Sequence, residues 1–207
     1  MDTGPMTTDR ARSHYHHGDL ESALISTARK LVKQEGAENL SLRQVSHEIG
    51  VSPSAAYHYF PDRTALLSGL GFSLFEELAD YQEKEISKIS GNSARAARER
   101  FRTIGRTYFQ WAKKEPHLFN LMFGDFCTLE SAGQKNHEES RAFNNLTKCL
   151  DELYEFDLIT EKMRPYGELL AWSVVHGTTS LIIGGHLESE NFETALDAVE
   201  LALGIKR

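Results

Sequence analysis

The chain of 207 residues has little of what builds tight turns, crosslinks or membrane spans. It contains five prolines, and its glycines seldom cluster, which favours helices over a fold with many turns. The two cysteines, Cys127 and Cys149, form no CxxC pair, so the simplest interpretation is a cytoplasmic protein with reduced thiols. No apolar run approaches the roughly 20 residues that span a bilayer. Residues 1–17 also lack the apolar core of a secretory signal.

The sequence also lacks the short motifs of common enzyme classes. It has no GxSxG, HExxH, GxGxxG or P-loop pattern, and the run HEE at 137–139 is without the second histidine of a zinc-protease helix. The histidines at 14, 16 and 17 have no cysteine or carboxylate beside them at ligand spacing. We therefore expect no enzyme, no metal site and no cofactor.

Charge permits DNA binding without indicating it. The net charge is −7 at neutral pH. Residues 1–64 hold 7 Lys and Arg against 8 Asp and Glu, a balance of −1, and residues 65–207 hold 16 against 22, a balance of −6. The acidity therefore lies mainly in the second part. Five of the nine histidines fall in the first part, where they can be partly protonated near a polyanion.

The segment 41–60, SLRQVSHEIGVSPSAAYHYF, predicts two short helices joined by a tight turn. Ser41 is a good N-cap, and Gln44 three residues later completes a capping box. Gly50 stands where the first helix ends. Ser52 is a second N-cap, followed by Pro53 in the first turn of the next helix. The buried face of the first helix is expected at Leu42, Val45 and Ile49.

This arrangement is a helix-turn-helix motif or a helical hairpin of an ordinary bundle, which uses similar caps. The residues favour the first interpretation. They are Gly50-Val51-Ser52, then Tyr57-His58-Tyr59-Phe60, then Arg63 and Ala65-Leu66-Leu67. The combination resembles the N-terminal DNA-binding domain of the TetR family of transcriptional regulators. Ser46 stands where that family usually has a small Ala, and Pro53 and Ala55 replace residues that often carry hydrogen-bonding side chains. These differences affect which bases are read.

The resemblance implies double-stranded operator DNA as a partner, with the second short helix in the major groove. We expect Ser54 and Ala55 at base edges, Ala55 against a thymine methyl group. The arginines and the two tyrosines of the set are expected at phosphates, and Phe60 is expected in the core. The predicted DNA-binding set is Ser41, Arg43, Ser52, Ser54, Ala55, Tyr57, His58, Tyr59 and Arg63.

Helical periodicity continues through the rest of the chain, and we find neither a strand-period region nor an internal repeat. We expect an all-α protein of about nine helices, with a three-helix helix-turn-helix domain followed by a helical bundle for ligand binding and dimerisation. The expected divisions are a flexible arm at 1–17, the DNA-binding domain at 18–64 and the bundle at 65–207. Helices are expected from Asp19 to about 35, from 62 to about 90, from 93 to 115, at 116–123, around 143–153, from Pro165 to 183 and from a cap at Asn191 to 203, with a loop at 125–137.

A second resemblance lies near the C-terminus. The stretch AWSVVHGTTSL at 171–181 is similar to the Trp-His-Gly motif of one C-terminal class within the TetR family, through Trp172, His176 and Gly177. The segment EPHLFNLMFG at 115–124 is similar to part of the same class. A well-packed helix in which His176 is merely hydrogen-bonded is compatible with this resemblance. The resemblance implies a homodimer formed through the last two helices, packed as a four-helix bundle.

The aromatic residues of the second half predict a mainly apolar or aromatic small-molecule effector, with two histidines as polar anchors. Together with the DNA-binding segment, this predicts a ligand-responsive regulator, most simply a repressor that the effector releases from its operator. The alternative is a helical small-molecule carrier or an enzyme that uses the same pocket. The predicted ligand-binding set is Phe101, Tyr108, Trp111, His117, Phe123, Phe143, Trp172 and His176.

Overall fold

The computed structural model describes residues 17–124 and 140–205, and within these ranges it contains helices and no strands. The all-α prediction of about nine helices is confirmed. The predicted arm and the predicted loop at 125–137 lie outside the described residues, apart from residue 17. The α-helices are α1 (His17–Glu35), α2 (Leu42–Glu48), α3 (Pro53–Tyr59), α4 (Arg63–Ile86), α5 (Ala94–Lys114), α6 (Pro116–Phe123), α7 (Arg141–Glu155), α8 (Gly167–Ile183) and α9 (Asn191–Leu203).

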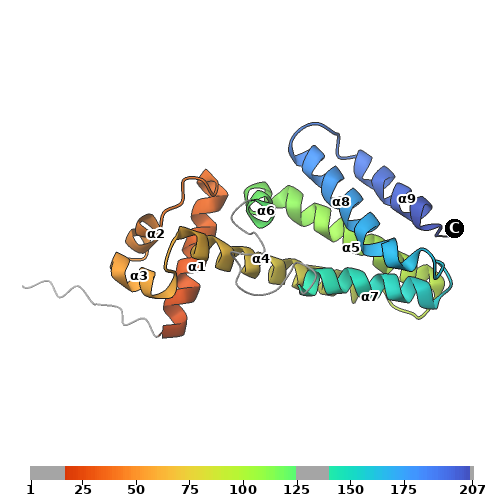
Figure 1. Ribbon diagram of the computed structural model, residues 1–207, viewed down its shortest axis with the longest axis horizontal. Helices are drawn as coiled ribbons and strands as arrows, with labels where there is room; N and C mark the ends of the chain where they lie inside the picture. The colour runs from red at the N-terminus through yellow and green to blue at the C-terminus, as the bar shows by residue number, and fades with distance from the viewer. Residues whose placement is uncertain (1–16, 125–139, 206–207) are drawn as a thin grey trace, which may run out of the picture.

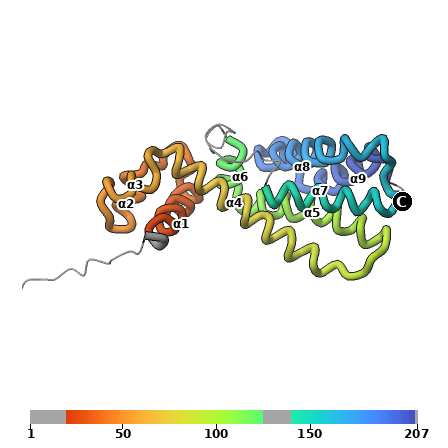
Figure 2. The backbone as a smooth tube through the Cα atoms, turned by 60° about the horizontal axis from the view of Figure 1, so that its bottom comes forward, coloured from red at the N-terminus to blue at the C-terminus, as the bar shows by residue number. Residues whose placement is uncertain are grey.

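The molecule is elongated, and α4 connects its two parts (Figure 1). Helices α1, α2 and α3 pack together at one end, while α5, α7, α8 and α9 form a bundle at the other. Figure 2 shows the same division from a second side. With 24 residues, α4 is about 36 Å long. It contacts α1 in one part and α5 and α7 in the other, so the predicted boundary at 64–65 falls at the start of a shared helix.

The capping residues predicted for the helix-turn-helix segment act as N-caps in the structure. The Ser41 hydroxyl accepts a hydrogen bond of 3.1 Å from the backbone N–H of Gln44, and Ser52 accepts one of 3.2 Å from the N–H of Ala55. Between the two helices, Gly50 has a φ of +72°, a conformation that a residue with a Cβ adopts at a cost. The turn between α2 and α3 is therefore defined by local chemistry.

The core is continuous from the end formed by α1, α2 and α3 into the bundle. Apolar residues of α1 to α4 share one cluster with residues of α5 and α6, and a second cluster lies between α5, α7, α8 and α9. The predicted core anchor Phe60 is buried and packs close to Gly69 of α4. In the bundle, the Leu196 side chain lies where a Cβ on Gly105 would stand, so this glycine lets α9 approach α5. Both parts of the molecule pack against α4, which contacts α1 at one end and α5 and α7 at the other.

Several predicted helix ends differ from the observed ones. The first helix begins at His17, two residues before Asp19, and α4 ends at Ile86. Pro165 lies in a short 3-10 turn, Arg164–Tyr166, ahead of α8. Asn191 is the first residue of α9 and not its cap, although its Oδ1 atom accepts a hydrogen bond of 3.1 Å from the N–H of Glu188. None of the described helices combines the length and the apolar character needed to cross a bilayer.

Candidate DNA interface and effector pocket

Helix α3 turns one face inward and leaves the other uncovered. Ala56 is fully buried against the core, whereas Ser54, Tyr57 and His58 are exposed. The predicted base contact Ala55 is half-buried, as is Tyr59. This division leaves polar and aromatic side chains on the outer surface of α3, within a unit held by α1 and α2.

Around α3, the remaining predicted DNA-binding residues have different surroundings. Ser41, Arg43 and Ser52 are exposed at the starts of α2 and α3. Arg63 is partly buried, and its guanidinium donates to main-chain carbonyls of the turn between α1 and α2, from Nε to Leu40 at 2.8 Å and from Nη2 to Ala37. Arg63 therefore holds this turn against the start of α4, a role that the motif spacing did not indicate. Its contact with DNA stays a prediction.

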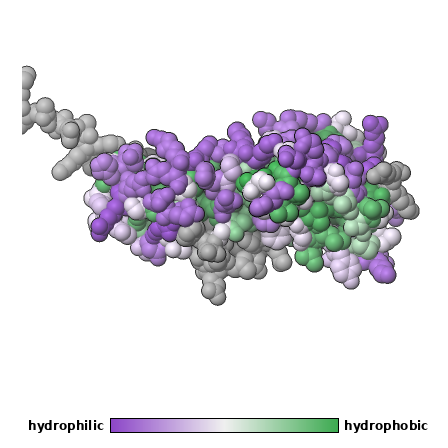
Figure 3. Space-filling model, turned by 90° about the horizontal axis from the view of Figure 1, so that it is seen from above, coloured by the Kyte–Doolittle hydropathy of each residue, from purple (hydrophilic) through white to green (hydrophobic). Residues whose placement is uncertain are grey.

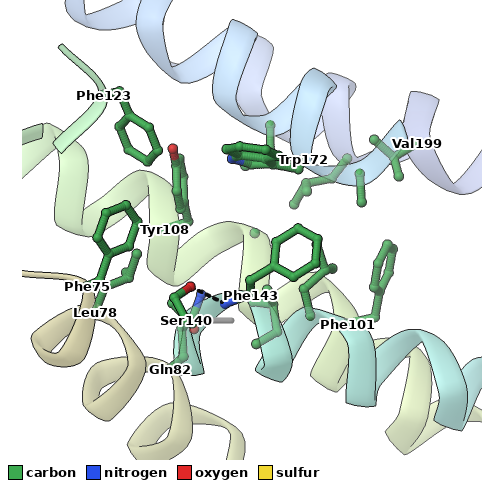
Figure 4. Close-up of a pocket in the computed structure, with 17 residues that line it drawn as sticks. Phe75, Leu78, Gln82, Phe101, Tyr108, Phe123, Ser140, Phe143, Trp172 and Val199 are labelled. Carbon is green, nitrogen blue, oxygen red and sulfur yellow. Dashed lines mark hydrogen bonds between the residues drawn. The ribbon is translucent and has the colours of Figure 1, made fainter. Parts of the chain in front are cut away.

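The bundle encloses a narrow apolar hollow of about 650 Å³, counted out to its open mouth. Much of this volume lies between side chains and at the open mouth, so the hollow is a slot and not a roomy chamber. Figure 4 shows its walls, which come from α4, α5, α7, α8 and α9, with Phe123 of α6 at one end. Five members of the predicted ligand-binding set line it: Phe101, Tyr108, Phe123, Phe143 and Trp172.

A hydrogen-bonded group closes one corner of the hollow. The hydroxyl of Tyr108 lies 2.8 Å from Nδ1 of His176. Burial raises the pKa of Tyr108, while a hydrogen bond from Trp172 acts in the opposite direction. His176 lies behind the wall among aromatic rings, 4.6 Å from Phe123 between ring centroids. Since its ring is bonded to Tyr108 and does not line the hollow, His176 positions wall residues from outside.

The other two predicted ligand-binding residues lie away from the hollow. Trp111 turns toward α1 and donates a hydrogen bond of 3.0 Å to Oε1 of Glu77 on α4. His117 is exposed at the start of α6. Trp111 is buried, but it lies on a broad inner face of α5 of which only a part lines the hollow.

Glu77 links the two parts of the molecule. Its carboxylate accepts hydrogen bonds from Trp111 of the bundle and from Arg29 of α1, the latter at 2.9 Å from Nη2 to Oε1. Burial alone raises the pKa of Glu77, but the bonds from Arg29 and Trp111 outweigh burial and lower it. Lys33 of α1 makes a second link, 2.8 Å from the buried carboxylate of Glu115 before α6. These contacts connect α1 with α5 and with the residue that precedes α6.

Gln82 of α4 is a wall residue that the sequence reasoning missed. It is buried and lines the hollow beside Leu78. The two residues are four apart, so helical spacing places Leu78 and Gln82 on the same face of α4. A glutamine on the inner face of an otherwise apolar helix is the sequence feature that could have identified this wall residue. Among the side chains that the structure describes, no group of three or more His, Cys, Asp or Glu residues is arranged to hold a metal ion.

The two ends of the chain match two family profiles. Residues 24–70 match the profile described as bacterial regulatory proteins of the tetR family, and residues 101–203 match the tetracyclin repressor-like C-terminal domain. The chain belongs to the TetR family. The first match spans most of α1, then α2, α3 and the start of α4, and the second spans most of α5 and the helices α6 to α9.

Individual proteins are similar to part of this chain or share its fold. The nucleoid occlusion factor SlmA from Mannheimia succiniciproducens is 27% identical over 106 residues, which cover 49% of this chain and 45% of that protein. A protein of unknown function from Rhodococcus sp. RHA1 shares the fold, with 26% identity, a TM-score of 0.72 and coverage of 93% of this chain and 99% of that one. FadR from Bacillus subtilis, solved with stearoyl-CoA, is 16% identical with a TM-score of 0.68 over 89% and 99%. The chain spans about half the length of most curated relatives that it matches.

Proposed function

We propose that this TetR-family protein is a cytoplasmic, ligand-responsive repressor that binds operator DNA through α3 and releases it when an apolar molecule fills the hollow. The observation that carries the proposal is the uncovered face of α3, where Ser54, Tyr57 and His58 are exposed beside a capped turn. A short helix with one face in the core and the other free fits the major groove. The proposed function is binding and involves no chemical step.

The proposed contacts follow from the positions of the side chains. Arg43, Tyr57 and Tyr59 lie on or beside the outer surface of α2 and α3, where they would bind phosphates and so supply affinity without reading sequence. Ser54 and Ala55 stand in the first turn of α3, the part of a recognition helix that contacts base edges. Sequence preference is assigned to these two residues.

The effector is proposed to act through α4 and the groups bonded to it. The hollow is lined by Phe75 and Leu78 of α4, and Glu77 lies between them in sequence with Arg29 and Trp111 bonded to its carboxylate. A molecule that pushes α5 away from α4 would move Trp111 and disturb this link. Because α1 carries the helix-turn-helix, the angle of α3 would change with it.

A homodimer through α8 and α9 is also part of the proposal. Helix α8 is apolar around most of its circumference, yet only a strip containing Ala171, Val175 and Thr179 is buried. Leu181 of α8 and Leu201 of α9 are exposed large hydrophobic residues. In Figure 3, hydrophobic side chains gather on the half of the molecule that contains these helices. A helix that is apolar on all sides favours burial, and a second copy would supply it.

The test is a gel shift with the DNA that flanks the protein's own gene, because such regulators often act on adjacent genes. We expect retention of one segment at protein concentrations that leave a scrambled DNA of equal length and composition free. Retention should weaken as salt rises, since phosphate contacts release counterions. Equal retention of flanking and scrambled DNA would refute an operator there. If the chain bound apolar molecules but no DNA, the result would favour the alternative function, a small-molecule carrier.

A further inference from the structure

Gln82 differs from the other polar residues that line the hollow. The hydroxyl of Tyr108 is bonded to His176, and Trp172 donates to Tyr108. The hydroxyl of Ser140 caps α7 by accepting a hydrogen bond of 3.2 Å from the N–H of Phe143 (Figure 4, dashed line). These groups are already engaged with the protein. The Ser140 hydroxyl keeps its own O–H as a donor, but Ser140 is only half-buried. The carboxamide of Gln82 belongs to a buried residue and has hydrogen-bonding capacity left over.

The geometry around Gln82 shows which end of the carboxamide is available. The residue is 2% exposed, and its Oε1 atom accepts a long hydrogen bond of 3.4 Å from Nδ2 of Asn145. The opposite orientation would set one NH2 group against another, so Oε1 must face Asn145. The Nε2 group then has two hydrogens to donate, and no acceptor for them lies among the residues of 17–124 and 140–205. Nε2 is therefore a donor without a protein partner on a residue that lines the hollow, where a ligand acceptor could bind it.

The charges next to Gln82 argue against an anionic ligand group. Asn145 also lies 3.5 Å from Oε1 of Glu83, on the rim between α4 and α7. Glu83 shares Arg141 with Glu76 and Asp80, at 2.8 to 2.9 Å. Lys148 lines the same rim groove as Glu83, but the three carboxylates share Arg141 as their ion-pair partner. A ligand carboxylate would add to an existing excess of negative charge.

We propose that the effector is an uncharged, mainly apolar molecule with one oxygen acceptor, such as the carbonyl of a ketone, ester or amide, that accepts a hydrogen bond from Nε2 of Gln82. This inference rests on the proposed function and assigns the specificity of its pocket to one residue. The apolar body would extend from Gln82 past Trp172 toward Val199, along the wall that Figure 4 shows. Discrimination would come from the site's unpaired donor, which an analogue without an acceptor leaves unsatisfied.

The experiment uses three probes of similar size on the full chain. Butyrophenone carries a carbonyl, butylbenzene lacks an acceptor, and 4-phenylbutanoate carries a carboxylate. Each is titrated against the bound reporter N-phenyl-1-naphthylamine, whose displacement gives a dissociation constant. The ratio of the constants for butylbenzene and butyrophenone is compared between the wild-type chain and Gln82→Leu, so that differences in hydration of the two probes cancel. Ile104→Val, which trims the same hollow without removing a polar group, is the matched control.

We expect the ratio to fall by about 2- to 10-fold in Gln82→Leu, as for the loss of one net hydrogen bond, and to stay unchanged in Ile104→Val. We also expect 4-phenylbutanoate to bind more weakly than butyrophenone to the wild-type chain. The inference would be overturned if Gln82→Leu left the ratio unchanged, or if the wild-type chain bound 4-phenylbutanoate as tightly as butyrophenone. Either result would leave the apolar pocket itself in place. If no variant binds the reporter or any probe, the effector site of the proposed function fails as well. Circular dichroism and thermal unfolding of each variant verify the fold.

Discussion

Tyr57 and Tyr154 are equally exposed, each at 43%, but lie in different parts of the molecule. Tyr57 projects from α3 beside Ser54, whereas Tyr154 stands near the end of α7 in the bundle. Exposure alone therefore does not distinguish the tyrosine that we propose to bind DNA from an ordinary surface residue. The helix that carries it does, because α3 is capped and oriented by the turn before it.

At this scale we predict that Tyr57→Phe weakens DNA binding by about 0.5–1.5 kcal/mol, the net value of one hydrogen bond to phosphate. The loss should be similar on operator and scrambled DNA, since a phosphate contact carries no sequence information. Fluorescence anisotropy with labelled DNA measures both affinities. Tyr154→Phe is the control and should change neither. A change in base preference without a change in affinity would show that Tyr57 contacts bases and not phosphates.

Helices α5 and α9 are joined along their exposed edge by arginines and carboxylates. Arg102 and Arg106 of α5 both bond to Glu193 at the start of α9, with Nε of Arg106 at 2.8 Å from Oε1. Arg98 adds a pair with the buried carboxylate of Glu200. The hydrogen bond from Arg106, together with that from Arg102, lowers the pKa of Glu193 to about 2. Helix α9, which forms part of the wall of the hollow, is thereby fixed to α5.

At the element scale we predict that Glu193→Gln destabilises the chain by about 0.5–1 kcal/mol at pH 7, a value discounted because the carboxylate is half-exposed. The folded pKa lies below the ordinary 4.5, so this stabilisation is present above that pH and is lost as pH falls toward 2. Urea unfolding at pH 7 and pH 3, at one protein concentration, should show a smaller gap at pH 3. Glu161→Gln, an exposed residue without an ion pair among the described side chains, is the control. A gap that is constant with pH would contradict the assignment.

Sequence reasoning located the elements well because their ends are set by local chemistry. Ser41, Gly50 and Ser52 act through bonds and dihedral angles within four residues, so the helix-turn-helix could be read directly. The site was predicted less completely. The aromatic content of the second half predicts Trp111 in the pocket and does not single out Gln82, because hydrophobicity and spacing do not indicate which neighbour a buried face contacts. Neighbours are a property of tertiary packing.

On the scale of the whole molecule, the proposed dimer is the feature most open to direct measurement. We predict that Leu181→Glu on α8 converts a dimer at micromolar concentration into a monomer, because a buried unpaired carboxylate opposes association. Light scattering should give twice the 23.4 kDa of one chain for the wild type and a single chain mass for the variant. Phe72→Glu, which replaces an exposed hydrophobic residue of α4, should leave the dimer intact. A monomer mass for the wild-type chain would contradict the proposed dimer.

The shared helix α4 also restricts how such a chain can change in length. Because both parts pack on one uninterrupted helix, the rotational phase between Leu67 at one end and Gln82 at the other is set by the number of residues between them. One inserted residue would turn α3 by about 100° about the axis of α4, relative to the hollow. Three or four residues nearly restore the phase, with a shift of about 5 Å along the axis. Chimeras that exchange DNA-binding ends between relatives should therefore tolerate junctions in α4 that differ by whole turns and reject those that differ by one or two residues.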